Sequence, residues 1–232
     1  MKLDGQAALV TGANRGLGRQ LALQLRDRGV KVYAAARNPA AIDLDGVTPI
    51  QLDITDPASV AAAVELAKDV SILVNNAGSS TGASFLTGDL ADVRLEMDTH
   101  YFGTLSVVRA FAPTLARHDN SAVLNVLSVL SWITFPTVGA YSAAKSAAWS
   151  LTNALRQELA PQGTVVSALH VGYMDTDMAK HVEEPKSDPA DIARIAVDGI
   201  VAGNPEIVAD DTSKYVLSQL SGGVSALYQQ SA

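Results

Sequence analysis

The chain has 232 residues, 48% of them hydrophobic and 18% charged, with a formal net charge of −7 and no cysteine. This length supports one sizeable core, the acidic balance disfavours nucleic acid and anionic membranes as partners, and the missing thiols exclude disulfides, thiolate catalysis and cysteine-ligated zinc. The first residues lack the apolar segment of a secretory signal and no apolar run is long enough to span a membrane, so we expect a cytoplasmic protein, and we predict no metal site.

A glycine-rich turn follows the first expected strand, Ala7–Val10. Gly12, Gly16 and Gly18 lie in the run T-G-A-N-R-G-L-G, directly before a segment with helical spacing. Without side chains the backbone can approach a pyrophosphate while the helix N-terminus faces its negative charge. The spacing is G-x-x-x-G-x-G rather than the commoner G-x-G-x-x-G. A turn without a ligand is the alternative, but the strand–turn–helix context favours phosphate binding.

The second expected strand, Val30–Ala36, ends at Arg37. In dinucleotide folds this tip meets the adenosine ribose, where an acid binds the 2′-hydroxyl of NAD and a guanidinium suits the 2′-phosphate of NADP. Arg15, inside the glycine turn, is a second cation that can flank the same phosphate. Each arginine could instead be an ordinary solvated side chain. Together with the missing acid, they predict NADP(H) rather than NAD(H).

Two further strands complete a repeating pattern. Val47–Leu52 ends in Asp53, an alanine-rich helix follows over 58–67, and Ser71–Val74 is followed by Asn75-Asn76-Ala77-Gly78. The two amides can tie neighbouring strand ends together, although a simple turn is the alternative. The β-α alternation predicts parallel strands with right-handed crossovers, and ligands bind such sheets beyond the carboxyl ends of the strands.

Three candidate catalytic residues follow the next apolar run, Ala122–Leu127. Ser128 leaves the end of this strand, and Tyr141 and Lys145 lie four residues apart on an expected helix. Residues at this spacing lie one turn apart on one side of a helix, where an ammonium lowers the pKa of a phenol. The three groups can converge on one substrate oxygen and move a proton. Taken alone, a Tyr-x-x-x-Lys pair is more often an ordinary helix surface.

In this order and spacing, T-G-A-N-R-G-L-G, N-N-A-G, Ser128 and Y-S-A-A-K resemble the short-chain dehydrogenase/reductase family, in its NADP-preferring carbonyl reductase-like branch. The match runs from Ala7 to about Thr176. The resemblance implies an α/β fold: one Rossmann-like domain over 1–232 with a doubly wound parallel sheet in three layers. It also implies exchange of a hydride between a nicotinamide and a carbonyl or alcohol carbon.

The resemblance assigns roles by position. Ser128 polarises the substrate oxygen, Tyr141 is the general acid or base, and Lys145 lowers the pKa of the tyrosine and holds the nicotinamide ribose. Besides Tyr141 and Lys145, the residues expected to contact the cofactor are Gly12, Asn14, Arg15, Gly16, Leu17, Gly18, Arg37, Asp53, Ile54, Asn76, Ala77, Gly78, Gly172, Met174 and Thr176.

His100 is the first departure from the family pattern. A long helix is expected after Asp89, and where the family has an asparagine that kinks this helix and holds a water linking the lysine to solvent, this chain has His100. An imidazole can donate or accept a hydrogen bond and titrates near neutrality. We therefore expect His100 to maintain the proton relay as a fourth catalytic residue. The alternative is that His100 only packs.

The second departure follows the sixth expected strand, Val165–Leu169. The family tends to have Pro-Gly and then a threonine near the cofactor, whereas this chain has V-G-Y-M-D-T over 171–176, which lacks the proline. A polar segment completes a substrate loop over about 173–188, which we expect to close on binding. A helix from Pro189 to about Ala202, a strand at 206–209 and a weak helix at 212–220 follow.

Two predictions concern partners. The expected helix Tyr141–Leu159 carries apolar residues on more than one face, which predicts a homodimer or homotetramer. If half of the candidate wall residues face the cleft, the substrate is small and apolar. These wall residues are Phe85, Leu86, Trp132, Ile133, Phe135, Tyr173 and Met174.

The sequence therefore predicts an NADPH-dependent reductase or dehydrogenase of a small ketone, aldehyde or secondary alcohol. The alternative is a redox sensor or scaffold that binds NADP(H) without turnover. Such relatives typically lack the tyrosine or the lysine, whereas this chain has both Tyr141 and Lys145. A third possibility is epimerisation or dehalogenation on the same fold.

Overall fold

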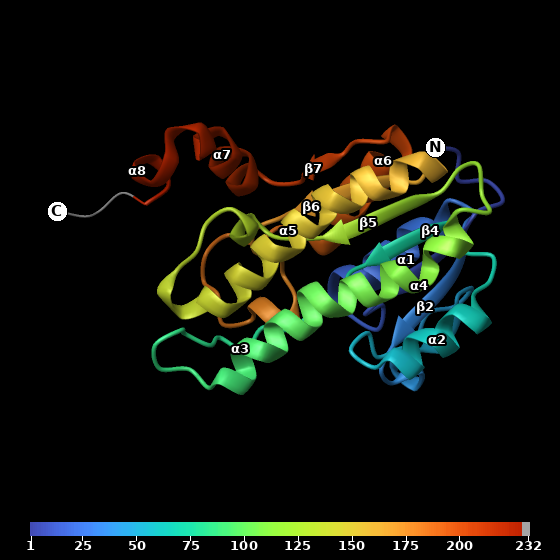
Figure 1. Ribbon diagram of the computed structural model, residues 1–232, viewed down its shortest axis with the longest axis horizontal. Coiled ribbons are helices and arrows are strands. Elements are labelled where there is room, and N and C mark those ends of the chain that lie inside the picture. Colours follow the sequence, from blue (N-terminus) through green and yellow to red (C-terminus); the bar gives the residue numbers. More distant parts are fainter. Residues whose placement is uncertain (229–232) are drawn as a thin grey trace.

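The computed structural model describes residues 1–228, which form one seven-stranded sheet flanked by helices (Figure 1). Every strand pair is parallel, and the strand order is β3-β2-β1-β4-β5-β6-β7. The strands are β1 Ala7–Thr11, β2 Lys31–Ala36, β3 Thr48–Gln51, β4 Ile72–Asn75, β5 Ala122–Val126, β6 Val165–His170 and β7 Glu206–Val208. The predicted single-domain, doubly wound α/β fold is confirmed.

Helices cover both faces of this sheet. One layer holds α1 Gly16–Asp27 and α6 Pro189–Ala202, which pack on each other, and the other holds α2 Pro57–Leu66, α4 Thr104–Leu115 and α5 Gly139–Leu159. The remaining helices are α3 Leu90–Met97, which leads into α4, and α7 Asp211–Gln219 and α8 Gly223–Leu227 near the C-terminal end (Figure 1).

The central strands are buried on both sides, which explains their unbroken apolar sequence. In β1, Ala8 and Val10 pack in the core beneath α1 and α6, whereas Ala7 and Leu9 pack in the core beneath α2 and α4. This alternation follows from the two-residue period of a strand. Each core is continuous under its helix layer, so the sheet is a rigid support for the loops at its carboxyl edge.

The strand order reverses between β1 and β4, because β2 and β3 lie on one side of β1 and β4 to β7 on the other. Ligand sites of open α/β sheets lie at such a reversal, beyond the carboxyl ends of the strands. Within residues 1–228, no helix combines the length and the hydrophobicity needed to cross a bilayer. The cytoplasmic location stays a prediction.

Candidate active site

Ser128, Tyr141 and Lys145 come together at the carboxyl end of β5. Ser128 caps the short turn Val129–Ser131, where its Oγ accepts a hydrogen bond from the backbone N–H of Leu130 at 3.1 Å. A hydroxyl that accepts this bond still has its own proton to donate. Lys145 Nζ lies 5.5 Å from the centre of the Tyr141 ring, one turn along α5, and donates to the carbonyl oxygen of Val126 at 2.8 Å.

The pKa of Tyr141 differs from the sequence prediction. Burial raises the pKa of this phenol well above its usual range, the charge of Glu96 raises it further, and the hydrogen bond from Ser128 opposes both effects. Burial also lowers the pKa of Lys145 to about 8, against the opposing effect of Glu96. The prediction that Lys145 lowers the pKa of Tyr141 is therefore wrong for this structure, because burial and a nearby carboxylate raise this pKa and Lys145 is not among the groups that shift it.

Glu96, in α3, is the residue that sequence analysis missed. Its side chain is fully buried, its Oε2 accepts from Ser79 Oγ at 3.2 Å, and its Oε1 accepts from the backbone N–H of Thr81. Its Oε2 also lies 3.2 Å from His100 Nε2. Burial raises the pKa of this carboxyl, but the hydrogen bonds from His100 and Thr81 lower it more, so the net shift is downward. The available signal was its position four residues before His100.

His100 lies in a π-helical segment, Asp98–Gly103, that joins α3 to α4. Its ring meets the Tyr141 ring edge-on, with the ring centres 5.1 Å apart. Its Nε2 lies 2.9 Å from the carbonyl oxygen of Ser79 as well as close to Glu96, and since both of these oxygens are acceptors, Nε2 carries the proton. Burial and then the charge of Lys145 lower the pKa of His100, which leaves the imidazole neutral with Nδ1 as an acceptor.

The predicted glycine turn packs tightly against the N-N-A-G segment. Asn76 Nδ2 donates to the carbonyl oxygens of Thr11 at 2.9 Å and Gly12 at 3.2 Å, so this amide ties the ends of β1 and β4 together as predicted. A Cβ atom on Gly18 would lie 2.2 Å from the Gly12 oxygen and 2.3 Å from Asn76 Nδ2. Only glycine therefore fits at this position.

The turn fits the phosphates of a dinucleotide. Gly12 and Gly16 have left-handed backbone angles, with φ of +66° and +53°, and α1 begins at Gly16 with no acidic residue in its first turn. An unopposed helix N-terminus attracts an anion. Thr176 packs near Gly16, and Arg15 Nη1 lies 3.4 Å from Asp177 Oδ2. The beginning of the substrate loop thus borders the turn.

Arg37 and Asp53 lie together at the other end of this edge, in a cavity of about 490 Å³ that also includes Gln51 and Asp56. Asp53 Oδ1 accepts from Thr55 N at 2.9 Å and from Thr55 Oγ1 at 2.7 Å, and these bonds, with the charge of Arg37, lower the pKa of the Asp53 carboxyl. An adenosine ribose with a 2′-phosphate would find a guanidinium here.

Several other residues that we predicted to bind the cofactor are buried in the core or contact other parts of the protein. The side chains of Leu17 and Ile54 are buried in the two cores, so only their backbones are available to a cofactor, and Asn14 is half-buried. A Cβ atom on Gly78 would lie 2.7 Å from His100 Cε1, and the backbone N–H of Gly172 donates to Asp210 Oδ2 at 2.6 Å.

Backbone hydrogen bonds join the two ends of the substrate loop. Asp175 N donates to the Ser187 oxygen at 3.0 Å and Ser187 N donates to the Tyr173 oxygen at 2.9 Å. Met174 forms a bridge with Ser187 and packs on the core beneath α1. Closure of the loop on a substrate stays a prediction.

The family relationship is established by comparison with known proteins. Residues 6–187 match the model of the short chain dehydrogenase family. A short chain dehydrogenase from Burkholderia cenocepacia, solved in complex with NADP, is 35% identical and superposes with a TM-score of 0.93, covering 98% of this chain and 97% of that one. Oxidoreductase UcpA of Escherichia coli is 34% identical over 82% of this chain and 77% of its own. The 3-oxoacyl-[acyl-carrier-protein] reductase FabG of Staphylococcus aureus is 29% identical over 94% of this chain and 98% of its own.

Proposed function

The chain belongs to the short chain dehydrogenase family of oxidoreductases, and on that basis we propose that it is an NADPH-dependent reductase of a small, apolar ketone or aldehyde, or a dehydrogenase of the matching secondary alcohol. The observation that carries this proposal is the convergence of Ser128, Tyr141 and Lys145 beside a turn shaped for phosphates. The same set argues against epimerisation or dehalogenation.

Each side chain has a defined task in the reduction. The cofactor, when bound, supplies the hydride that goes to the carbonyl carbon. Tyr141 gives its phenolic proton to the carbonyl oxygen, and Ser128 donates a hydrogen bond to that oxygen as negative charge develops on it. Because burial raises the pKa of Tyr141, the phenol is protonated at neutral pH and has a proton to give. Lys145 supplies positive charge beside the phenol.

The preference for NADP(H) rests on two cations, Arg15 in the glycine turn and Arg37 beside the cavity with Asp53. The relative from Burkholderia cenocepacia was solved with NADP, which agrees with this preference. We expect kcat/KM to be at least about tenfold higher with NADPH than with NADH, and Arg37→Ala to reduce this ratio, since one ion pair to a phosphate is lost. Equal efficiencies for the two cofactors would contradict the preference.

The apolar substrate is supported by a cavity that begins at Ser142, the neighbour of Tyr141 on α5. Phe85, Trp132 and Ile133 line this cavity of about 170 Å³, and neither a charged side chain nor any of the three candidate catalytic residues lines it. Tyr173 and Phe135 are about half exposed, and Leu86 projects almost entirely into solvent. An apolar lining favours an apolar substrate portion and disfavours a sugar phosphate.

The decisive experiment follows NADPH oxidation against a panel of ketones and aldehydes. Wild-type protein should turn over at least one compound, and Tyr141→Phe should lose turnover while it still binds NADPH. Tyr215→Phe, an exposed tyrosine on α7, is the matched control and should behave as wild type. Binding of NADPH without turnover of any compound by the wild type would instead favour the redox sensor or scaffold.

A further inference from the structure

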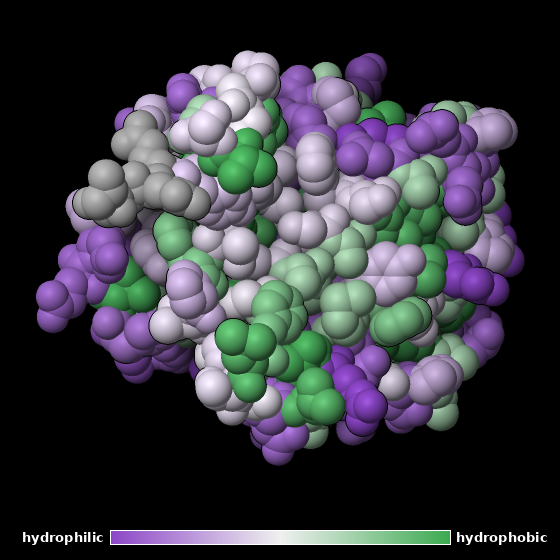
Figure 2. Space-filling view, turned by 60° about the vertical axis from the view of Figure 1, so that its left-hand side comes forward, coloured by the Kyte–Doolittle hydropathy of each residue, from purple (hydrophilic) through white to green (hydrophobic). Residues whose placement is uncertain are grey.

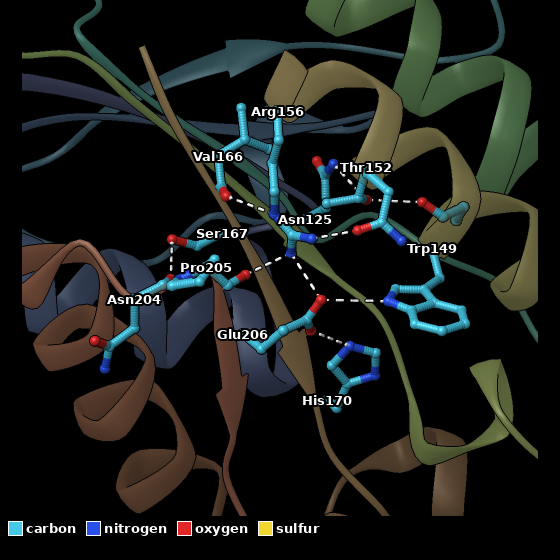
Figure 3. A network of polar contacts seen from close by, with 12 residues as sticks. Asn125, Trp149, Thr152, Arg156, Val166, Ser167, His170, Asn204, Pro205 and Glu206 are labelled. Atoms are coloured by element: carbon cyan, nitrogen blue, oxygen red, sulfur yellow. Dashed lines mark hydrogen bonds and ion pairs between the residues drawn. The ribbon is translucent and has the colours of Figure 1, made fainter. Parts of the chain in front are cut away.

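A buried histidine and a half-buried glutamate form a pair on the Ser128 side of the site. His170, the last residue of β6, is fully buried, and its Nε2 lies 2.7 Å from Oε2 of Glu206 in β7 (Figure 3). Its Nδ1 lies 3.3 Å from the backbone carbonyl oxygen of Ser128. The pair thus connects the edge of the sheet to the segment that carries the candidate catalytic serine.

Glu206 is held by three donors from three side chains. Its Oε1 accepts from Arg156 Nη2 at 2.9 Å and from Trp149 Nε1 at 3.3 Å, and its Oε2 faces His170 (Figure 3). Burial raises the pKa of the Glu206 carboxyl, but the bonds and charges of His170 and Arg156 lower it more, and the net shift is downward. Glu206 is therefore a carboxylate and has no proton to donate.

The two ring nitrogens of His170 both face acceptors. The carboxylate of Glu206 lies at one nitrogen and the backbone carbonyl oxygen of Ser128 at the other, so the ring is held between β7 and the end of β5. Trp132 stacks on this ring, with the ring centres 3.9 Å apart and the planes 16° from parallel.

We propose that His170 acts as a positioning residue, which fixes Ser128 through its carbonyl oxygen and Trp132 through the stacked ring. The proposal rests on the proposed function, because Ser128 matters as the donor to the substrate oxygen and Trp132 as a wall of the apolar cavity. The Ser128 segment and the cavity wall are thereby aligned by one side chain, which Glu206 in the last strand holds in place. Small displacements of groups that orient a substrate reduce the rate strongly.

The positioning role has its own readouts. In His170→Phe the aromatic ring can still stack on Trp132 but both N–H donors are lost, so the ¹³C signal of the Ser128 carbonyl should move and kcat should fall about tenfold with the KM for NADPH unchanged. His118→Phe, far along the chain at the end of α4, is the matched control and should leave both unchanged. An unmoved carbonyl signal in His170→Phe would contradict the role. Absence of turnover in the wild type would count against the proposed function only, since the carbonyl signal is measured without substrate.

Discussion

A single buried carboxylate sets the charge balance around the candidate acid. Glu96 is fully buried, and its negative charge raises the pKa of both Tyr141 and Lys145. It thus helps to keep the phenol protonated and, at the same time, helps Lys145 to stay an ammonium in a position where burial favours the neutral amine. His100 supplies the hydrogen bond that keeps this carboxylate ionised.

Removal of the Glu96 charge should shift the pH dependence of the reduction. With the pKa of Lys145 at about 8, the ammonium is lost above that pH, and we expect kcat/KM at saturating NADPH to fall there. In Glu96→Gln the pKa of Lys145 loses the effect that raises it and moves lower, so the alkaline limb should move to lower pH. Glu65→Gln, which alters an exposed carboxylate on α2, should leave the limb in place. An unchanged limb in Glu96→Gln would show that Glu96 does not act on Lys145.

The pH dependence of the reduction below neutral pH tests whether His100 relays protons. Because its pKa is lowered, His100 is neutral at neutral pH and gains a proton only as the pH falls below its usual titration range. That proton occupies Nδ1, which then cannot accept, so a relay through His100 stops and activity should decline. In His100→Asn no titrating group remains at this position, and the acid limb attributable to it should disappear. If both proteins lose activity at the same acid pH, His100 only packs.

The contrast between residues shows what the sequence can and cannot predict at this scale. The four-residue spacing of Tyr141 and Lys145 is a geometric property of a helix, and the structure places both beside Ser128 as expected. The direction of the Tyr141 pKa was predicted wrongly, because it depends on burial and on Glu96, which belongs to another helix. Roles that arise from desolvation or from contacts between distant segments leave no local pattern.

Helices and strands were predicted from the sequence more completely than the pKa shifts of individual residues. Most strands appear in largely apolar runs, although β3 is T-P-I-Q. Three helix starts have aspartate caps: Asp56, Asp89 and Asp188 each accept from the backbone two residues on. The long helix expected after Asp89 is interrupted by the π-helical segment Asp98–Gly103. A π-helical turn depends on how a side chain is accommodated between packed elements, here His100 against Gly78 and Tyr141, so the periodicity of the sequence does not reveal it.

The glycine turn makes a prediction at the scale of elements. In Gly18→Ala the added methyl group would overlap the Gly12 oxygen and Asn76 Nδ2, so α1 must move away from the end of β1. We expect a loss of about 1–3 kcal/mol in the free energy of unfolding and at least tenfold weaker NADPH binding. Thermal unfolding and a fluorescence titration with NADPH measure the two effects. Gln20→Ala changes a half-buried residue of the same helix and should leave both the free energy of unfolding and the affinity for NADPH nearly unchanged. Normal NADPH affinity in Gly18→Ala would show that the turn does not bind the cofactor.

At the scale of the whole molecule, the sheet order explains why sites far apart in sequence meet. The reversal between β1 and β4 sets the glycine turn beside the N-N-A-G segment, and β5 and β6 continue the same edge with Ser128 and Gly172. The sequence predicts this arrangement from the alternation of strands and helices. It does not predict that Glu206, in the edge strand β7, reaches back to His170, because side-chain contacts between strands depend on their register.

The surface of α5 carries a stripe of small residues that the sheet does not cover. Ala143, Ser150 and Ala154 are exposed and Ala147 is half-buried, at spacings of four, three and four residues. Figure 2 shows weakly and strongly hydrophobic residues crossing the middle of one face of the molecule, with hydrophilic residues gathered at its rim. Leu95 in α3 and Phe102 in the π-helical segment add exposed apolar area. Small residues allow the close approach of a second helix, which favours a two-fold assembly.

We therefore expect the protein to be a homodimer or homotetramer, with α5 in the interface. Multi-angle light scattering at micromolar concentration should give a mass of at least two chains, and Ala154→Arg should lower it toward that of one chain, because a buried unpaired guanidinium is costly. Ala61→Arg places the same charge on an exposed alanine of α2, away from the α5 stripe, and should leave the mass unchanged. A monomeric wild type would refute the assembly, whereas an oligomer that tolerates Ala154→Arg would move the interface to another surface and leave the α5 stripe facing solvent.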